Sequence, residues 1–286
     1  SPVVAPLTLR ADRFYISPNS GPSQFAGKKC HENYFVASWQ NDSLHESAGI
    51  NASNLGYKNA YILAPNYQAG KDALAGFKRY FDGEIVGEIY TKLGQTDYAA
   101  EIAKIRAADP EMVFHFLPGG MGINFMKQYD QAGLGDDIPL VLAAPSADVN
   151  ILRAVGSAMV GINNTSHWNH DLDNDANKGF VAGFEEKYDR VPTVYASQGY
   201  DTARLIASAL RATGGKVTDD MDGFRSALRA ADFDSVRGPF KFNTNNHPIQ
   251  NWYGRVVVEE NGEFHNKIIG VVAENHEDAY VGDCKM

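Results

Sequence analysis

Residues 59–90, NAYILAPNYQAGKDALAGFKRYFDGEIVGEIY, decide the fold class of this 286-residue chain. The two ends of the stretch, 59–64 and 85–90, are short apolar runs of the kind that forms buried strands. Three apolar residues between them share the spacing of one helix face, i, i+3 and i+7: Leu74, Phe77 and Phe81. A strand, a helix and a second strand in this order predict two parallel strands joined by a crossover helix.

The same alternation continues on both sides of this stretch. Further strands are predicted at 13–16, 112–117, 139–143 and 159–162. Helical spacing recurs at Tyr98, Ile102 and Ile105, and at Phe125 and Tyr129. Thr96 or Asp97 is suited to cap the first of these helices, and Gly133 is suited to end the second. The pattern predicts an α/β fold with parallel sheets flanked by helices.

Beyond Ser166 the pattern changes to helices, which are predicted at 173–188, 198–212 and 219–230. Strands are predicted again at 238–242, 252–258 and 267–272, with Asn261-Gly262 as a hairpin turn between the last two. This order indicates two lobes between which the chain passes more than once.

The composition argues against several classes of protein. Lys and Arg number 26 against 35 Asp and Glu, a net charge of −9, so neither nucleic acid nor an anionic membrane is an expected partner. No apolar run approaches the roughly 20 residues that span a bilayer, so no membrane insertion is expected. Because Ser1 is not Met and no signal-peptide pattern follows it, we expect that a signal was removed or that the chain is a fragment.

No metal site is expected. Asp171, Asp173 and Asp175 match the first three positions of a calcium loop, but Ala176 and Ala182 stand where that loop needs Gly and Glu. A solvated helix start is the preferred interpretation of these carboxylates.

The chain has two cysteines, Cys30 and Cys284, which are too few and too far apart for a zinc site. They leave two alternatives open at this point. One is a single disulfide in an exported protein, and the other is a pair of buried thiols.

No catalytic or cofactor motif is complete. Residues 21–25 lack the final glycine of a serine-hydrolase elbow, and Phe125 stands where a dinucleotide fingerprint at 120–125 needs its third glycine. His31, His45 and His115 have no evident acid partner, and His115, in an apolar run, is expected in the core. We therefore expect no cofactor and no catalysis.

Polar turns follow several of the predicted strands, at 17–21, 65–70, 118–122 and 145–148. In an open α/β sheet these turns lie at the carboxyl ends of the strands, where ligands bind. Backbone N–H groups at such a helix start suit a ligand carboxylate, although a simple tight turn is the alternative at each place. Together the turns indicate a binding cleft.

Several stretches carry a family resemblance along the whole chain. They are ISPNSGPSQFAGKKC (16–30), YILAPNYQAGKDALAGFK (61–78), GQTDYAAEIAKIRAADPEMVF (94–114), PGGMGINFMKQYDQAGL (118–134), and SHWNHDLDNDANKGFVAGFEEKY (166–188) with VYASQGYDTARLI (194–206). The chain resembles the type I periplasmic solute-binding proteins of ABC transporters, in the leucine/isoleucine/valine-binding branch. The last pair resembles the subgroup associated with aromatic acids as well as amino acids.

This resemblance implies two α/β lobes joined by three crossovers, near 39–41, 165–167 and 250–252, that close on a ligand about a hinge. Lobe 1 would comprise 1–39 and 166–250, lobe 2 would comprise 40–165 and 251–272, and 273–286 would form a C-terminal tail. Relatives begin on the order of 80 residues earlier in domain-scale terms, so the N-terminal part of lobe 1 is expected to be missing. Val36 stands where many relatives have Arg.

The resemblance also implies a set of ligand-binding residues. Asn19, Ser20 and Gly21 would meet a carboxylate, and Tyr67 would close over the ligand. The remaining implied residues are Pro118 and Gly119 as a wall, Ser146 at the amino-group position of amino-acid binders, and Trp168, Gln198 and Tyr200, each with packing or a hinge role as the alternative. Because Ser146 is not acidic, ligands without an ammonium group are favoured, unless Asp148 or Asp201 supplies the charge. A disulfide between Cys30 and Cys284 is expected in such an exported protein.

We therefore expect a periplasmic, non-enzymatic, monomeric protein that delivers a small carboxylate to ABC permease subunits. The ligand would be an aromatic or keto acid, or a branched-chain or other amino acid. The alternatives are a ligand-sensing module of a receptor or regulator with the same fold, and a hydrolase-like or dehydrogenase-like enzyme.

Overall fold

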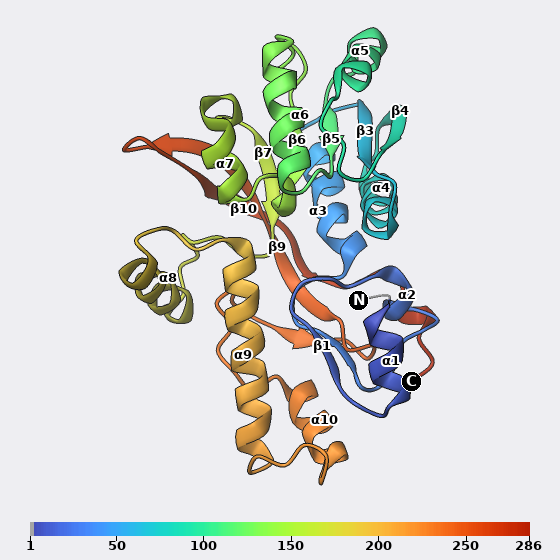
Figure 1. Cartoon of the computed structure of the whole chain (residues 1–286), viewed down its shortest axis with the longest axis vertical. Helices are drawn as coiled ribbons and strands as arrows, with labels where there is room; N and C mark the ends of the chain where they lie inside the picture. The colour runs from blue at the N-terminus through green and yellow to red at the C-terminus, as the bar shows by residue number, and fades with distance from the viewer. Residues whose placement is uncertain (1–2) are drawn as a thin grey trace. The chain divides into compact units, whose positions relative to one another are not determined.

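The structure is a computed structural model that describes residues 3–286, and the chain divides into two compact units. Unit 1 comprises Ser1–Ser43, His167–Asn251 and Glu274–Met286, and unit 2 comprises Leu44–Ser166 and Trp252–Ala273. The chain therefore changes unit after residues 43, 166, 251 and 273. Figure 1 follows the elements in chain order by colour.

Unit 2 is built on parallel strands with covering helices. Its strands are β3 (Asn59–Pro65), β4 (Glu84–Thr91), β5 (Val113–His115), β6 (Val141–Ala143) and β7 (Asn163–Ser166), followed by parts of β9 (Pro248–Glu260) and β10 (Glu263–His276). Its helices are most of α3 (Asn41–Asn54), α4 (Gln68–Tyr80), α5 (Ala99–Ala108), α6 (Gly120–Gln131) and α7 (Val149–Val155), with the 3₁₀ turns η1 (Ala144–Ser146) and η2 (Gly156–Met159).

The strand order in unit 2 is β4-β3-β5, then β6-β7-β9-β10, and an isolated parallel bridge between Val113 and Leu140 links the two groups. β3, β4 and β5 are parallel, as are β6 and β7, whereas β9 runs antiparallel to β7. The predicted β-α-β arrangement of β3, α4 and β4 is confirmed. Leu63, Phe125 and Leu142 are among the fully buried side chains of its core.

Unit 1 contains short strands and three long helices. Its elements are α1 (Val4–Arg10), β1 (Tyr15–Ser17), α2 (Ser23–Ala26), β2 (Tyr34–Val36), α8 (Asp175–Tyr188), α9 (Val194–Ala212), α10 (Met221–Ala230), β8 (Lys241–Phe242) and η3 (Val281–Asp283). β1 and β2 are parallel, and β8 pairs antiparallel with β9. α9 and α10 pack side by side (Figure 1), with Leu205, Phe224 and Leu228 buried against Phe35 of β2.

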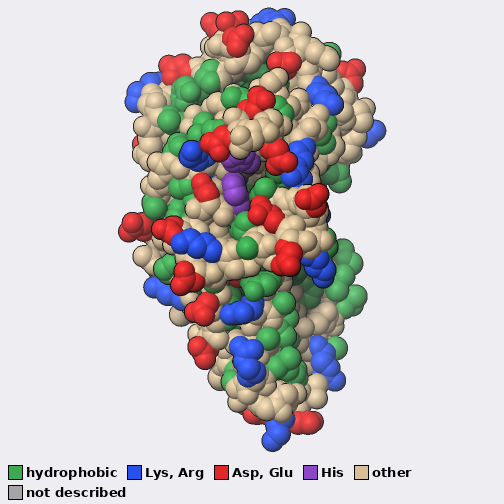
Figure 2. Space-filling model, turned by 90° about the vertical axis from the view of Figure 1, so that its left-hand side faces the viewer, with side chains coloured by type: hydrophobic (Ala, Val, Ile, Leu, Met, Phe, Trp, Pro, Cys, Tyr) green, Lys and Arg blue, Asp and Glu red, His purple; other side chains and the backbone are tan. Residues whose placement is uncertain are grey.

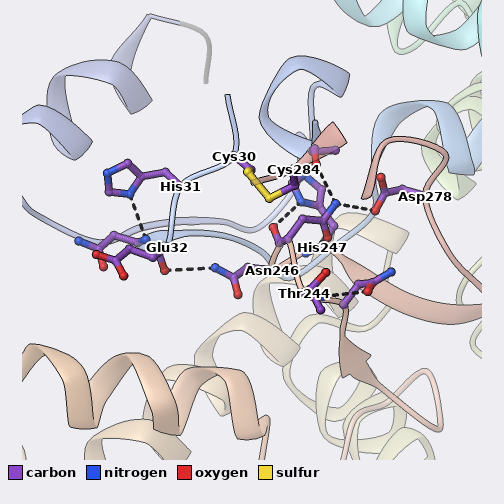
Figure 3. The surroundings of a disulfide bond; sticks show 12 residues. Cys30, His31, Glu32, Thr244, Asn246, His247, Asp278 and Cys284 are labelled. Carbon is purple, nitrogen blue, oxygen red and sulfur yellow. Dashed lines mark hydrogen bonds between the residues drawn. A yellow bond between two sulfur atoms is a disulfide. The ribbon is translucent and has the colours of Figure 1, made fainter. Parts of the chain in front are cut away.

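The C-terminal segment returns to unit 1 and is joined there covalently. Cys30 and Cys284 form a disulfide that links positions 254 residues apart in the sequence (Figure 3). Near it, the carboxylate of Asp278 accepts a hydrogen bond of 2.8 Å from the amide of Asn245. The tail is thus fixed to unit 1 by a covalent bond and by buried polar contacts.

The strand predicted at 159–162 is wrong in position. Met159 ends the 3₁₀ turn η2, Gly161 has φ +84°, and the strand is β7, Asn163–Ser166. The side chains of Met159 and Ile162 are buried in the core, but both residues precede the strand. The strand itself is polar, so an apolar pattern could not reveal it.

Other boundaries differ more modestly. α9 begins at Val194, four residues before the predicted start, because the hydroxyl of Thr193 accepts a hydrogen bond from the Ala196 amide and caps the helix. β8 starts three residues later than predicted, and β9 extends at both ends. The hairpin turn at Asn261-Gly262 is confirmed, with positive φ at both residues as a tight turn of this kind requires.

Candidate ligand-binding site

The carboxyl ends of the parallel strands in unit 2 lie at one edge of the sheet, as parallel order requires. Tyr67 follows β3 as the N-cap residue of α4, Gly119 follows β5 as the N-cap residue of α6, and Ser146 follows β6 in η1. Three of the residues that the sequence analysis singled out are therefore brought to a common edge.

Tyr67 is partly exposed at this edge and stacks on the buried ring of Phe116. Their rings are nearly parallel, 14° apart in plane, with centroids 6.3 Å apart. Burial raises the pKa of the Tyr67 hydroxyl, and the charge of Asp72 raises it further, so the group is a neutral hydrogen-bond donor at physiological pH. Phe116 was not predicted as a site residue, because it fell inside the strand predicted at 112–117, whereas β5 ends at His115.

Gly119 supplies backbone where a side chain would not be tolerated. Its φ is +63° with ψ −136°, a conformation that essentially only glycine adopts. Gly119 is exposed and the preceding Pro118 is half-buried, so this turn presents main chain at the start of α6. We call Tyr67, Phe116, Pro118 and Gly119 the unit 2 half-site.

Ser146 is at the same edge, but its hydroxyl is hydrogen-bonded to backbone groups of the protein. It is 1% exposed, donates to the carbonyl of His115 and accepts from the amide of Leu117, both at 3.1 Å. These bonds hold the end of β5 against η1. Nearby Asp148 caps α7, where its carboxylate accepts a hydrogen bond from the Asn150 amide.

Two of the histidines of unit 2 provide no base. His45 and His115 are buried, and burial lowers the pKa of each to about 3, so both are neutral at physiological pH. His115 Nε2 lies 3.4 Å from the sulfur of Met126, and the ring of His45 packs edge-on against Phe116 with centroids 4.8 Å apart. As predicted for His115, these are core residues.

In unit 1 the turn after β1 is held by its own side chains. Ser17 Oγ donates to the Ser20 carbonyl at 2.6 Å and accepts from the Ser20 amide at 3.1 Å, while the Gly21 amide donates to Asn41 Oδ1 at 3.0 Å. A Cβ on Gly21 would lie 2.3 Å from the carbonyl oxygen of Trp39, so only glycine fits there. Asn19 is exposed on this turn.

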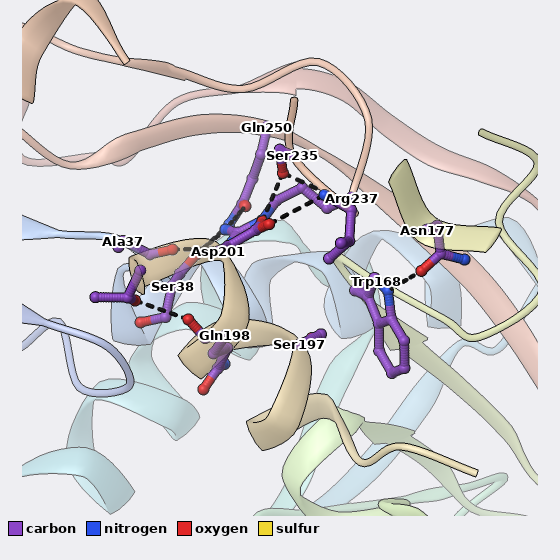
Figure 4. A network of polar contacts seen from close by, with 12 residues as sticks. Ala37, Ser38, Trp168, Asn177, Ser197, Gln198, Asp201, Ser235, Arg237 and Gln250 are labelled. Atoms are coloured by element: carbon purple, nitrogen blue, oxygen red, sulfur yellow. Dashed lines mark hydrogen bonds and ion pairs between the residues drawn. The ribbon is translucent and has the colours of Figure 1, made fainter. Parts of the chain in front are cut away.

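A buried ion pair connects α9 with the segment that follows β2 (Figure 4). Asp201 of α9 pairs with Arg237, which also donates to the carbonyls of Ala37 and Ser38 just after β2 and to Gln250. Asp201 further accepts from the Ser235 hydroxyl and from the Val236 amide. The suggestion that Asp201 could meet a ligand ammonium is therefore corrected, because Arg237 already neutralises this carboxylate.

Two buried polar side chains in this part of unit 1 have no protein partner. The amide oxygen and nitrogen of Gln198, a residue only 1% exposed, and the hydroxyl of fully buried Ser38 have no hydrogen-bond partner among residues 3–286. Gln198 lies one helical turn before Asp201 on α9, and Arg237 binds the Ser38 carbonyl (Figure 4). Sequence reasoning missed Ser38. With the turn 19–21, these residues form what we call the unit 1 half-site.

Trp168 and Tyr200 make contacts within unit 1. The indole of Trp168 donates to Asn177 at 2.7 Å, and Asn177 in turn donates to the backbone carbonyls of residues 169, 170 and 172. Tyr200 packs on Phe180 with ring centroids 4.7 Å apart and lines a separate surface cavity of 690 Å³ with Arg204 and Phe240. Tyr200 is thus not grouped with Gln198.

The surface shows no single-sign region on the face in Figure 2, where basic and acidic side chains are interspersed. Asn174 caps α8 and Asp173 pairs with exposed Lys178, so the acidic segment around 171–175 is a helix start. Within residues 3–286, no three His, Cys, Asp or Glu side chains are grouped to hold a metal ion. No helix in this range is long and apolar enough to cross a membrane.

The chain is similar to known binding proteins in sequence and in fold. The profile of the periplasmic binding protein family matches residues 2–263. A solute-binding protein of an ABC transporter from R. palustris, solved in complex with benzoate, is 31% identical with a TM-score of 0.91, over 98% of this chain and 76% of that chain. No curated protein gives a match.

Two further solved structures are similar. A solute-binding protein from Rhodopseudomonas palustris BisB5 in complex with 3,4-dihydroxybenzoic acid is 29% identical, with a TM-score of 0.85, over 96% of this chain and 76% of that chain. A leucine-binding protein from Thermotoga maritima is 18% identical with a TM-score of 0.81, over 94% and 75% of the respective chains, and supports the fold alone.

Proposed function

The chain belongs to the periplasmic binding protein family, and from this premise we propose that it binds a small aromatic carboxylate and delivers it to an ABC importer. The family and the solved relatives at 31% and 29% identity are solute-binding proteins, and the chain is not an enzyme. A periplasmic location, permease subunits as partners and a monomeric state belong to the same proposal. The Cys30–Cys284 disulfide supports an oxidising compartment.

The proposed ligand class rests on the nearby acidic groups, which already interact with other groups of the protein. An α-amino acid brings an ammonium group, and burying that charge without a carboxylate partner is expensive. Asp201 is neutralised by Arg237, Asp148 caps α7, and the Ser146 hydroxyl is bound to backbone groups. A carboxylate ligand without an ammonium group avoids this cost.

The unit 2 half-site supports an aromatic ligand body. The partly exposed ring of Tyr67 is backed by the roughly parallel, buried ring of Phe116 and offers a face against which a flat ligand ring can pack. The benzoate and 3,4-dihydroxybenzoic acid complexes of relatives at 31% and 29% identity point to the same class.

The unit 1 half-site would receive polar atoms of the ligand. The amide nitrogen of Gln198 and the hydroxyl of Ser38 are donors without a protein partner among the described residues, and a bound carboxylate would satisfy both. The Ser20 and Gly21 amides already have acceptors within the unit, so in this proposal the turn 19–21 shapes the site and Asn19 contributes its side chain. Closure about a hinge when the ligand binds belongs to the same proposal.

A calorimetric panel on the purified protein tests this proposal. Benzoate, 4-hydroxybenzoate and 3,4-dihydroxybenzoate are titrated beside leucine, phenylalanine and benzamide. Benzamide is the uncharged amide analogue of benzoate. We expect at least one aromatic acid to bind and the other three compounds to bind at least tenfold more weakly. In a thermal-unfolding assay, that acid at 100 times its Kd should add about 2.7 kcal/mol to the free energy of unfolding.

Two results would overturn the ligand class. One is that leucine or phenylalanine binds at least tenfold more tightly than every aromatic acid. The other is that benzamide binds as tightly as benzoate, which would exclude recognition of the carboxylate.

A further inference from the structure

The C-terminal tail is attached to unit 1 at several points besides its disulfide. Asp278, which is 3% exposed, accepts from Asn245, and Asn245 also donates to the carbonyl of Ala26 at the end of α2. A Cβ on Gly27 would lie 3.3 Å from the Cβ atoms of both Tyr280 and Asp283, so the tail packs closely over this glycine. Figure 3 shows the region around Cys284 and Asp278.

From this anchored position the tail reaches the start of α3. The hydroxyl of Tyr280 donates a hydrogen bond of 2.7 Å to Oδ2 of Asp42, a fully buried residue in the first turn of α3. The other oxygen, Oδ1, accepts from the side-chain amide of Gln40 at 3.1 Å. Gln40 Oε1 in turn accepts from the backbone amide and the hydroxyl of Ser43, at 2.9 and 3.2 Å.

These contacts lie on a short segment with two further connections. The chain leaves unit 1 for unit 2 directly after Ser43. The side chain of Asn41, in the same segment, accepts the hydrogen bond of the Gly21 amide at the turn 19–21. Residues 40–43 thus connect the C-terminal tail, the ligand-proximal turn and the first crossover within unit 1.

We propose that Tyr280 is a positioning residue for ligand binding: its hydrogen bond to Asp42 holds residues 40–43, and through Asn41 the Gly21 turn, in the conformation that binds ligand. The disulfide keeps Tyr280 in place by anchoring the tail. This inference rests on the proposed function for the identity of the ligand, but not for the local effect on residues 40–43.

The direction of the effect follows from the chemistry of the bond. A hydrogen bond from a hydroxyl to a buried carboxylate is stronger than a hydrogen bond between two neutral groups. Loss of the Tyr280 hydroxyl leaves Oδ2 of Asp42 with one hydrogen-bond partner fewer. The segment gains alternative conformations, so a smaller fraction of molecules is ready to bind, and the apparent Kd rises in proportion.

The experiment compares Tyr280→Phe with Tyr188→Phe, which removes a hydroxyl from a half-exposed tyrosine on α8. Hydrogen exchange of the Gly21 and Ser43 amides is measured without ligand, and the Kd for benzoate is measured by calorimetry. We expect Tyr280→Phe to speed exchange at these two amides and to raise the Kd by about tenfold. The control should change neither quantity. Replacing both cysteines, Cys30→Ser with Cys284→Ser, should produce the same local exchange pattern by releasing the tail.

The outcomes separate this inference from the proposed function. If wild-type protein binds no aromatic acid, the proposed function fails, while exchange at Gly21 and Ser43 still tests the role of Tyr280. Unchanged exchange at both amides in Tyr280→Phe overturns the inference. So does faster exchange spread evenly over unit 1, because that result indicates a general loss of stability.

Discussion

Nε of Arg237 lies 3.0 Å from Oδ2 of Asp201, and both side chains are almost completely buried. Burial lowers the pKa of Arg237 while the charge of Asp201 opposes the shift, so the guanidinium stays protonated and the pair remains ionic. The same guanidinium binds the carbonyls that follow β2. One ion pair therefore places the end of β2 against α9 and neutralises an acidic group one helical turn from Gln198.

Breaking this pair should be severely destabilising. Arg237→Met leaves the Asp201 carboxylate buried without its counter-charge, which should lower the free energy of unfolding by about 3–5 kcal/mol. The double variant Arg237→Met with Asp201→Leu should recover part of that loss. Urea denaturation of the two variants checks this, and a double variant less stable than Arg237→Met would contradict it.

Gln198→Leu should separate affinity from stability. Because the Gln198 amide is buried without a protein partner, removing it should leave the free energy of unfolding unchanged or raise it by up to about 1 kcal/mol. Benzoate affinity should fall by about tenfold, since one charge-assisted hydrogen bond is lost. The matched control is Gln131→Leu at an exposed position of α6. Reduced stability with unchanged affinity would show that the amide serves the fold instead.

Tyr67→Ala should weaken binding of an aromatic acid by roughly 1–3 kcal/mol, the range for losing a buried aromatic contact. Tyr67→Phe should retain most of the affinity if ring packing dominates. Tyr80→Ala, at the exposed end of the same helix, provides the control. Calorimetry measures all three, and an unchanged Kd in Tyr67→Ala would remove this residue from the site.

Gly21→Ala should disturb the turn after β1. The new Cβ would lie 2.3 Å from the carbonyl oxygen of Trp39, so the backbone must shift, at a cost of about 1–3 kcal/mol of stability. Gly183→Ala on the exposed face of α8 meets no atom within 4 Å and should stabilise the protein by about 0.5–1 kcal/mol. Thermal unfolding of both variants decides; equal melting temperatures would mean that the close approach at Gly21 is unimportant.

His45 and His115 should make stability depend on pH in acid. Their pKa of about 3 in the folded protein lies below the unfolded value near 6.5, so between these values the unfolded chain binds more protons. Stability is therefore complete above pH 6.5 and declines toward pH 3, by up to about 1.4 kcal/mol per pH unit for each histidine. His115→Leu should flatten this slope. Parallel slopes for wild type and His115→Leu would refute this.

Local chemistry made much of the fold predictable. The period of Leu74, Phe77 and Phe81 places α4 between two apolar strands, and Gly133, with φ +69°, follows the end of α6 as its position in the sequence predicted. α3 was not predicted, because small polar and charged residues such as Ser47 and Glu46 are buried along it and leave no apolar stripe to read. Its burial depends on partners from distant segments, among them Thr165 and Arg79.

The sequence by itself determined the α/β fold, the family resemblance and the turns that carry Tyr67 and Gly119, because apolar periodicity and turn-forming residues act over a few neighbouring positions. Only the tertiary structure decided which polar groups have hydrogen-bond or ion-pair partners within the protein and which have none. Asp201 is neutralised by a residue 36 positions away, and the Ser146 hydroxyl is bound to a strand 31 positions away, whereas Gln198 and Ser38 remain without a partner among residues 3–286. Hydrogen-bond satisfaction depends on groups that are distant in sequence, so no local pattern encodes it.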